Sequence, residues 1–207
     1  MIATNLSFAQ TSQTYQLPVK EILDLVDIKP RPAVRIDSRN QTMVMFDRLA
    51  FKTLEEMAAD EVRLAGLRIN PATNGPARAN YTYGVQILDI ATGKTTQISG
   101  LPEKMKVSDF SFSPDESKFA FTNTTASKIE LWLVDIATGR ATRLMNEGVN
   151  AAMGFPYVWA PGSDAMLVLT VPADRKPRSA EKELPSGPAV QERSEERRVG
   201  KECRSRW

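Results

Sequence analysis

The side chains that most often carry out covalent or metal chemistry are scarce in this 207-residue sequence. Histidine is absent, and Cys203 is the single cysteine. A Ser-His-Asp or Cys-His nucleophile pair needs a histidine that titrates near neutral pH, and a zinc site built on imidazole needs its neutral nitrogen. A lone cysteine cannot form a disulfide within the chain. The sequence therefore predicts no catalytic residue of these classes, no metal site and no cofactor.

The basic residues that could bind nucleic acid are concentrated at the end of the sequence. The chain has 27 Lys and Arg residues against 25 Asp and Glu residues, a net charge of +2. Residues 193–207 hold six of the basic residues and three of the acidic ones, so the rest of the chain carries a net charge of −1. A nucleic-acid-binding surface needs a basic stripe on the folded body, interleaved with aromatic residues. We therefore expect no nucleic-acid partner.

Both ends of the chain differ in composition from its middle. Residues 1–9 end in Ser7-Phe8-Ala9, and small residues at the first and third of these positions are what signal peptidase accepts. This favours the remnant of an export signal over the alternative, an ordinary frayed N-terminus. The sequence thus predicts an exported protein, and no apolar run is long enough to span a membrane. Residues 172–192 are rich in proline and charge, as in an exposed loop. Residues 193–207 have no regular apolar period; they indicate an unstructured, non-native tail or, alternatively, a basic interaction tail.

A near-duplicate segment recurs in the middle of the chain. Residues 89–98 read DIATGKTTQI and residues 135–144 read DIATGRATRL, 46 positions later. Each copy follows an apolar run and contains a glycine, Gly93 or Gly139, at a position where a short hairpin requires positive φ. Both copies are therefore predicted to be β-hairpins.

A second strand–turn–strand pattern accompanies these hairpins. It occurs at residues 110–121 and 157–168, with Pro114 and Pro161 in the turns, and a worn copy without the proline lies at residues 34–45. Four short antiparallel strands in about 46 residues is the size of a β-propeller blade. The predicted fold class is all-β: an incomplete β-propeller of two to three four-stranded antiparallel blades, occupying residues 15–171.

Two short helices are predicted to interrupt the strands. Residues 20–27 place apolar side chains on one helical face, and Thr53-Leu54-Glu55-Glu56 forms a capping box before a second apolar face that extends to Val62. Such faces are typical of packing surfaces. Residues 67–78 are expected to be irregular, because two prolines and a glycine occur close together there.

Two stretches resemble the S9 (prolyl oligopeptidase) family of serine peptidases, in particular its glutamyl-endopeptidase-like branch. They are YQLP at residues 15–18 with KEILDLVD at 20–27, and EVRLAGLRINP at 61–71 with TNGP at 73–76. The resemblance implies an N-terminal propeller followed by an α/β-hydrolase domain with a Ser-Asp-His triad. This sequence has neither histidine nor a G-x-S-x-G nucleophile elbow, so none of the family's catalytic residues can be assigned here.

The resemblance implies a function for the chain as the N-terminal propeller of an exported serine peptidase, inactive by itself. The propeller would gate and dock peptide substrates, and its partner would be the missing C-terminal hydrolase domain of the same polypeptide. Specificity for glutamate would need cationic or amide groups, for which Arg68, Asn74 and Arg78 are the candidates. The alternative is that both arginines are only solvated and Asn74 belongs to a turn. An alternative function is a stand-alone, propeller-like protein-binding module.

Overall fold

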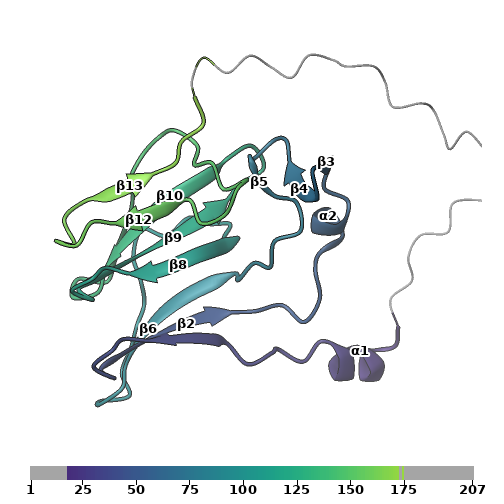
Figure 1. The fold of residues 1–207 in the computed structure, drawn as a ribbon. Helices are drawn as coiled ribbons and strands as arrows, with labels where there is room; N and C mark the ends of the chain where they lie inside the picture. Colours follow the sequence, from purple (N-terminus) through teal and green to yellow (C-terminus); the bar gives the residue numbers. More distant parts are fainter. Residues whose placement is uncertain (1–17, 173, 175–207) are drawn as a thin grey trace, which may run out of the picture. The chain divides into compact units, whose positions relative to one another are not determined.

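The computed structural model describes residues 18–172 and 174, and nearly all of them belong to one compact unit that ends at Val171. This unit consists of antiparallel sheets with two short helices, which confirms the predicted all-β class (Figure 1). The expected signal remnant at residues 1–9 and the expected tail at 193–207 lie outside the described residues. So does the expected loop at 172–192, apart from residues 172 and 174.

The first four-stranded sheet contains the worn strand–turn–strand copy and the first repeated hairpin. Its strands are paired antiparallel in the order β1-β2-β6-β7. The bounds are β1 (Ala33–Ile36), β2 (Thr42–Asp47), β6 (Gly84–Asp89) and β7 (Thr95–Thr96). Residues 48–83, which we call the insertion, connect its two inner strands.

The four strands of the second sheet are neighbours in the same order as in the sequence, and no insertion separates them. Its order is β11-β10-β9-β8, so the strand–turn–strand pattern at residues 110–121 and the second repeated hairpin lie side by side. The bounds are β8 (Val107–Phe112), β9 (Lys118–Thr124), β10 (Ile129–Asp135) and β11 (Arg140–Arg143). Gly93 and Gly139 have φ of +68° and +63°, as the turn chemistry predicts. The two near-duplicate segments therefore occupy equivalent places in successive sheets.

A third hairpin, β12 (Tyr157–Trp159) and β13 (Met166–Val168), covers the other face of the second sheet. On β9, Phe119 and Phe121 pack in a core shared with the first sheet, whereas Ala120 packs in a core shared with Tyr157. The period of two along a strand sends alternate side chains to opposite faces, so both faces of the second sheet are buried. Figure 1 shows the resulting stack, and the described sheets do not close into a ring.

Polar contacts between the hairpin turns join successive layers of this stack. Ser38, in the β1–β2 turn, donates from its backbone N–H and its hydroxyl to the Glu116 carboxylate, both at 2.8 Å. The Asp115 N–H donates to Ser163 Oγ at 3.0 Å in the same way, one layer further. The turns thus lie at corresponding positions, as expected for neighbouring blades.

The insertion corrects the prediction that residues 67–78 are irregular. A small three-stranded sheet forms there, in the order β3-β4-β5, with bounds β3 (Val62–Leu64), β4 (Leu67–Asn70) and β5 (Gly75–Pro76). Ala65 and Gly66 both have positive φ, which closes a two-residue hairpin between β3 and β4. Pro71 falls in the following turn, and Pro76 is tolerated because β5 is an edge strand. The prolines therefore bound the strands without preventing them.

The helices are shorter and less packed than predicted. The first, α1 (Lys20–Val26), has no buried residue, and α2 (Leu54–Met57) ends after one turn. Thr53 Oγ1 accepts a hydrogen bond from the Glu56 N–H at 3.2 Å, so this half of the expected cap is present. Val62 belongs to β3 instead of to the helix. The apolar faces of both helices are largely exposed, so they do not pack against the other described residues.

Candidate functional site

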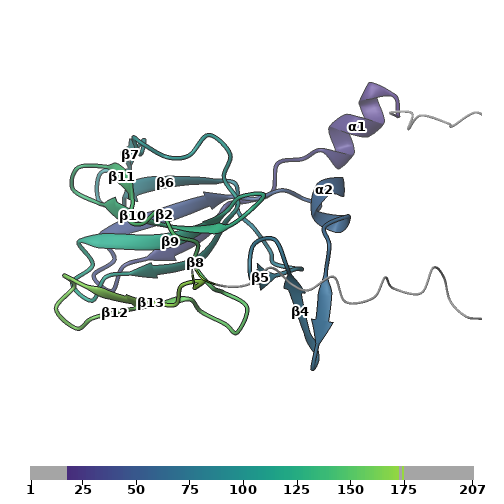
Figure 2. The same cartoon turned by 90° about the horizontal axis from the view of Figure 1, so that it is seen from above.

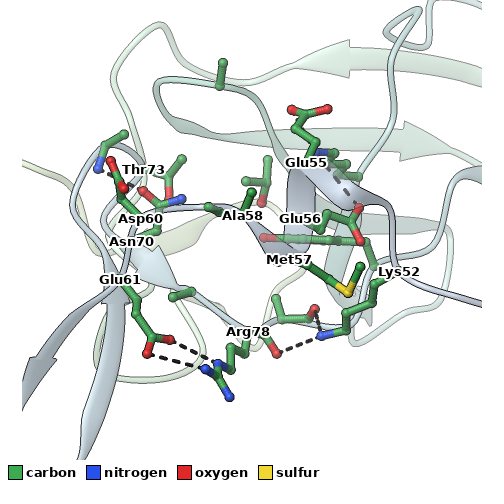
Figure 3. Close-up of a pocket in the computed structure, with 18 of the residues that line it drawn as sticks. Lys52, Glu55, Glu56, Met57, Ala58, Asp60, Glu61, Asn70, Thr73 and Arg78 are labelled. Carbon is green, nitrogen blue, oxygen red and sulfur yellow. Dashed lines mark hydrogen bonds and ion pairs between the residues drawn. The ribbon is translucent and has the colours of Figure 1, made fainter. Parts of the chain in front are cut away.

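A pocket lies where the insertion meets the second sheet. It has a volume of about 990 Å³. Its walls are α2, the segments around β5, and the residues that follow β9 (Figure 3). In Figure 2 the insertion, with α2, β4 and β5, lies at one end of the four-stranded sheets. The charged residues of the lining are Lys52, Glu55, Glu56, Asp60, Glu61, Arg78 and Lys106.

On one side of the pocket, the carboxylate of Glu56 contacts a tyrosine and a lysine. The Glu56 side chain is 6% exposed and accepts a hydrogen bond from the Tyr83 hydroxyl at 2.6 Å. Lys106 Nζ lies 3.3 Å from a Glu55 oxygen and 4.0 Å from a Glu56 oxygen. Burial raises the pKa of Tyr83 well above its usual value, and its hydrogen bond to Glu56 raises that pKa further. Tyr83 therefore keeps its proton and donates a hydrogen bond to Glu56 throughout the physiological pH range.

Lys52 joins two segments that line the pocket. Lys52 Nζ donates to the backbone carbonyl oxygens of Arg78 and Ala79 at 3.4 Å and 3.0 Å. These contacts join the segment before α2 to the segment after β5. They leave the Arg78 guanidinium directed toward Glu61 (Figure 3).

Three guanidinium groups converge on a single carboxylate at the edge of this pocket. Glu61 Oε1 accepts from Arg63 Nε and Nη2 at 3.0 Å and 2.9 Å, and from Arg68 Nη1 at 2.7 Å. Arg78 Nε donates to Glu61 Oε2 at 3.0 Å, and its Nη2 lies 3.4 Å from Oε1. We call these four residues the arginine cluster. Its formal net charge is +2.

The electrostatics of the arginine cluster favour an ionised Glu61. Its hydrogen bond with Arg63 is the largest effect and lowers the pKa of Glu61; desolvation opposes it, and contacts with Arg78 and Arg68 lower the pKa further, so that the net shift is downward. Arg63 and Arg68 are directly opposite each other in the β3–β4 register. Like charges in that relation repel, and the Glu61 carboxylate between them offsets part of this repulsion.

The three residues predicted from the sequence are only partly brought together. Arg68 and Arg78 meet at Glu61, and Arg78 also lines the pocket. Asn74 lies in the β4–β5 turn with φ of +59°; its N–H donates to the Asn70 carbonyl, and its own carbonyl accepts from the Ala151 N–H, both at 3.0 Å. Its backbone therefore serves the turn and attaches the insertion to the chain beyond the second sheet.

Arg63 and Glu61 were missed as members of the site. A usable signal was present, because Glu61 and Arg63 are two residues apart and hence on the same face of an extended strand. The Ala65-Gly66 turn between two apolar stretches would have placed Arg68 opposite Arg63. The prediction that residues 67–78 are irregular excluded this pairing of Arg63 with Arg68.

The described part of the chain contains neither a cluster of metal-ligating side chains nor a membrane-spanning helix. No group of three or more His, Cys, Asp or Glu side chains is placed there to hold a metal ion. None of the described helices is both long and apolar enough to cross a membrane.

Comparison with known proteins gives two relatives with the same name. The chain is 30% identical over 190 residues to a probable chloroplastic glutamyl endopeptidase of Oryza sativa subsp. japonica, covering 86% of this chain and 20% of that protein. It is 31% identical over 186 residues to a probable chloroplastic glutamyl endopeptidase of Arabidopsis thaliana, covering 84% of this chain and 19% of the relative. No protein-family model matches the chain. The chain thus spans about one fifth of the length of these relatives, and the similarity supports a peptidase-related origin.

Proposed function

We propose that this chain is the N-terminal, propeller-like part of an exported serine peptidase of the S9 (prolyl oligopeptidase) family, resembling the glutamyl endopeptidases. The observation that carries the proposal is the similarity over 86% of the chain to a protein named as a glutamyl endopeptidase. The stacked four-stranded sheets support a propeller-like architecture. The small end residues of the Ser7-Phe8-Ala9 stretch support export.

The proposed role of this part is to gate and dock peptide substrates for a hydrolase domain of the same polypeptide. About four fifths of each relative lies outside the matched region, which leaves ample chain for such a domain. Exposed apolar side chains on and beside the two helices support a docking surface for it, since burying them would be favourable. They are Val19, Ile22, Leu25, Val26, Ile28, Leu49, Phe51, Leu54 and Met57.

The proposed contacts with a substrate carboxylate are Arg68, Asn74 and Arg78. Arg78 is supported best, because it lines the pocket and its guanidinium is oriented by Glu61. Arg68 is supported by its 2.7 Å contact with the same carboxylate. Asn74 is supported only through its position in the insertion, where its backbone serves the turn.

Sequencing the genomic locus beyond the codon for Glu192 tests this proposal. We expect an open reading frame that continues into a G-x-S-x-G motif on a strand-to-helix turn, followed by an aspartate and then a histidine. A frame of that kind would also replace residues 193–207 with native sequence. A frame that closes without these elements would contradict the proposal and would favour a stand-alone binding module.

A further inference from the structure

We propose that copies of this chain bind one another head to tail through the two end faces of the stack. The first sheet and the β12–β13 hairpin lie at opposite ends of the stack, with the second sheet between them (Figure 1). The outer face of the first sheet, which we call the leading face, has the apolar side chains Val34, Ile36, Met43, Met45 and Leu88. The outer face of the hairpin, which we call the trailing face, has Val158, Leu167 and, just beyond β13, Leu169. This contact goes beyond the proposed function, which does not include it.

The leading face is apolar and partly exposed. Val34 lies opposite Met45 in the strand register, Ile36 lies opposite Met43, and Met43 also lies opposite Leu88. Directly opposed residues share one face of a sheet, and the alternate residues of β2 and β6 are buried in the core shared with the second sheet. Val34 and Ile36 are 41% and 44% exposed, and the other three are half-buried. The first sheet therefore has apolar side chains on both faces, which is typical of strands that are covered on both sides.

The trailing face has the same character at the other end of the stack. Val158 and Leu167 lie directly opposite each other in the register of β12 and β13, and they are 63% and 74% exposed. Leu169 follows on the chain and is 51% exposed. The inward-facing pair of the hairpin, Tyr157 and Val168, packs in the core shared with the second sheet. The hairpin is therefore apolar on both faces, and burying its outer face would be favourable.

The turns of the stack show how one layer recognises the next. Each turn has one residue at positive φ, namely Asn40 at +55°, Glu116 at +59° and Ser163 at +63°. In the second and third layers, the side chain of this residue accepts a hydrogen bond from the preceding turn: Glu116 from Ser38, and Ser163 from the Asp115 N–H. In the first layer, Asn40 has an amide oxygen that can accept at the corresponding position.

A second copy provides the matching donor for the first layer. Gly162 directly precedes the residue at positive φ in the β12–β13 turn, as Asp115 does in its own turn, so its backbone N–H occupies the donor position. When the trailing face of one copy lies on the leading face of the next, this N–H faces the amide of Asn40. The two turns also contain opposite charges, Asp164 in one and Arg39 in the other. The contact that joins layers within one chain thus continues from one chain to the next.

Sedimentation velocity of the 207-residue chain tests the proposal. A head-to-tail contact leaves one leading and one trailing face free on every assembly, so further copies can add. We expect the average mass to rise about threefold or more above the 23.0 kDa of one chain as the concentration increases from about 1 to about 100 µM, and to return on dilution. A mass that stays at one chain, or aggregates that do not dissociate on dilution, would overturn the proposal.

Two variants that each block one face distinguish a head-to-tail contact from other modes of association. Ile36→Lys places a charge on the leading face, and Leu167→Lys places one on the trailing face. Each variant alone should remain a single chain, whereas an equimolar mixture should form a dimer of one chain of each kind, because one intact face of each kind is left. Association of either variant alone, or the absence of dimers in the mixture, would overturn the proposal.

A third variant and a measurement on the unmodified chain complete the test. Leu25→Lys adds the same charge to α1 at a side chain that is 73% exposed and should associate as the unmodified chain does; loss of association would assign the contact to the helix and overturn the proposal. If a lysine variant fails to fold, hydrogen exchange of the unmodified chain gives a second readout, since amide protection in β1 and β13 should increase with concentration. An increase confined to other segments would contradict the contact. These outcomes are independent of the genomic test of the proposed function.

Discussion

The hydroxyl of Tyr157 is the contact through which the stacking of β12 on the second sheet can be measured. This residue is 1% exposed. Its hydroxyl donates toward the carbonyl oxygens of Asp109 and Ala120, the latter at 2.8 Å, and accepts from Ser111 Oγ at 3.1 Å. All three partners lie on β8 or β9, so Tyr157→Phe removes polar contacts between layers while preserving the ring.

The expected loss of stability in Tyr157→Phe comes from the buried hydrogen-bonding groups that lose the tyrosine hydroxyl. A net hydrogen bond contributes about 1 kcal/mol, and a buried polar group left without its partner costs roughly 1–3 kcal/mol. Ser111 Oγ keeps its hydrogen bond from Trp159 Nε1 at 3.0 Å, which limits the loss on that side. We therefore expect the free energy of unfolding to fall by about 2 kcal/mol.

Urea unfolding of the two proteins, followed by circular dichroism, measures this difference. Thr95→Val serves as the control, because it removes a hydroxyl from the exposed strand β7 and should change stability by less than about 0.5 kcal/mol. A change of under about 0.5 kcal/mol in Tyr157→Phe would refute the reasoning, since it would mean that the hydroxyl is solvated. Burial also raises the pKa of Tyr157, so its ultraviolet titration should begin only above the range of an ordinary tyrosine.

Two further predictions concern the repeated turns. Gly93→Ala should lower the free energy of unfolding by about 1 kcal/mol, because the alanine would have to adopt a positive φ. Gly139→Ala should lower it further, because the added Cβ would also lie 3.1 Å from Thr96 Cγ2. Equal urea midpoints for the two variants would contradict this prediction. Hydrogen bonds from Thr138, first from its backbone N–H and then from its side chain, lower the pKa of Asp135. The ionised carboxylate therefore stabilises the folded state at pH values above the usual aspartate pKa. This stabilisation is lost as the pH falls and the carboxylate is protonated. The urea midpoint should therefore decline between about pH 5 and pH 3, and less steeply in Asp135→Asn; parallel declines would exclude this contribution.

The repeated hairpins could be predicted because their determinants are local. A glycine at positive φ, a proline in the turn and alternating apolar residues all act over a few positions, and they placed Gly93 and Gly139 correctly. The period of 46 residues then indicated which hairpins share a sheet. The stacking of Phe119 and Phe121 against the first sheet follows from the same alternation.

The insertion was predicted less well, because only part of it has local determinants. Ala65 has positive φ, a conformation that an alanine in the sequence does not indicate. Pro76 is tolerated in a strand because β5 is at the edge of its sheet. A Cβ at Gly75 would meet the end of the Ile129 side chain, on a strand far along the chain, so a larger residue there would require that side chain to move. Arg63 and Arg68 are paired by the local β3–β4 hairpin, and Arg78 follows the strand that pairs with β4; of these three arginines, Arg68 and Arg78 were predicted from the sequence.

The central claim is that the near-duplicate hairpins belong to successive sheets stacked face to face. Phe46 on β2 and Phe110 on β8 report this directly, because their ring centroids are 5.1 Å apart across the interface between the two sheets. In a sample with selectively labelled phenylalanines, the account predicts a nuclear Overhauser cross-peak between these two rings. Cross-peaks that join Phe110 only to Phe112 and Phe119, within its own sheet, would contradict it.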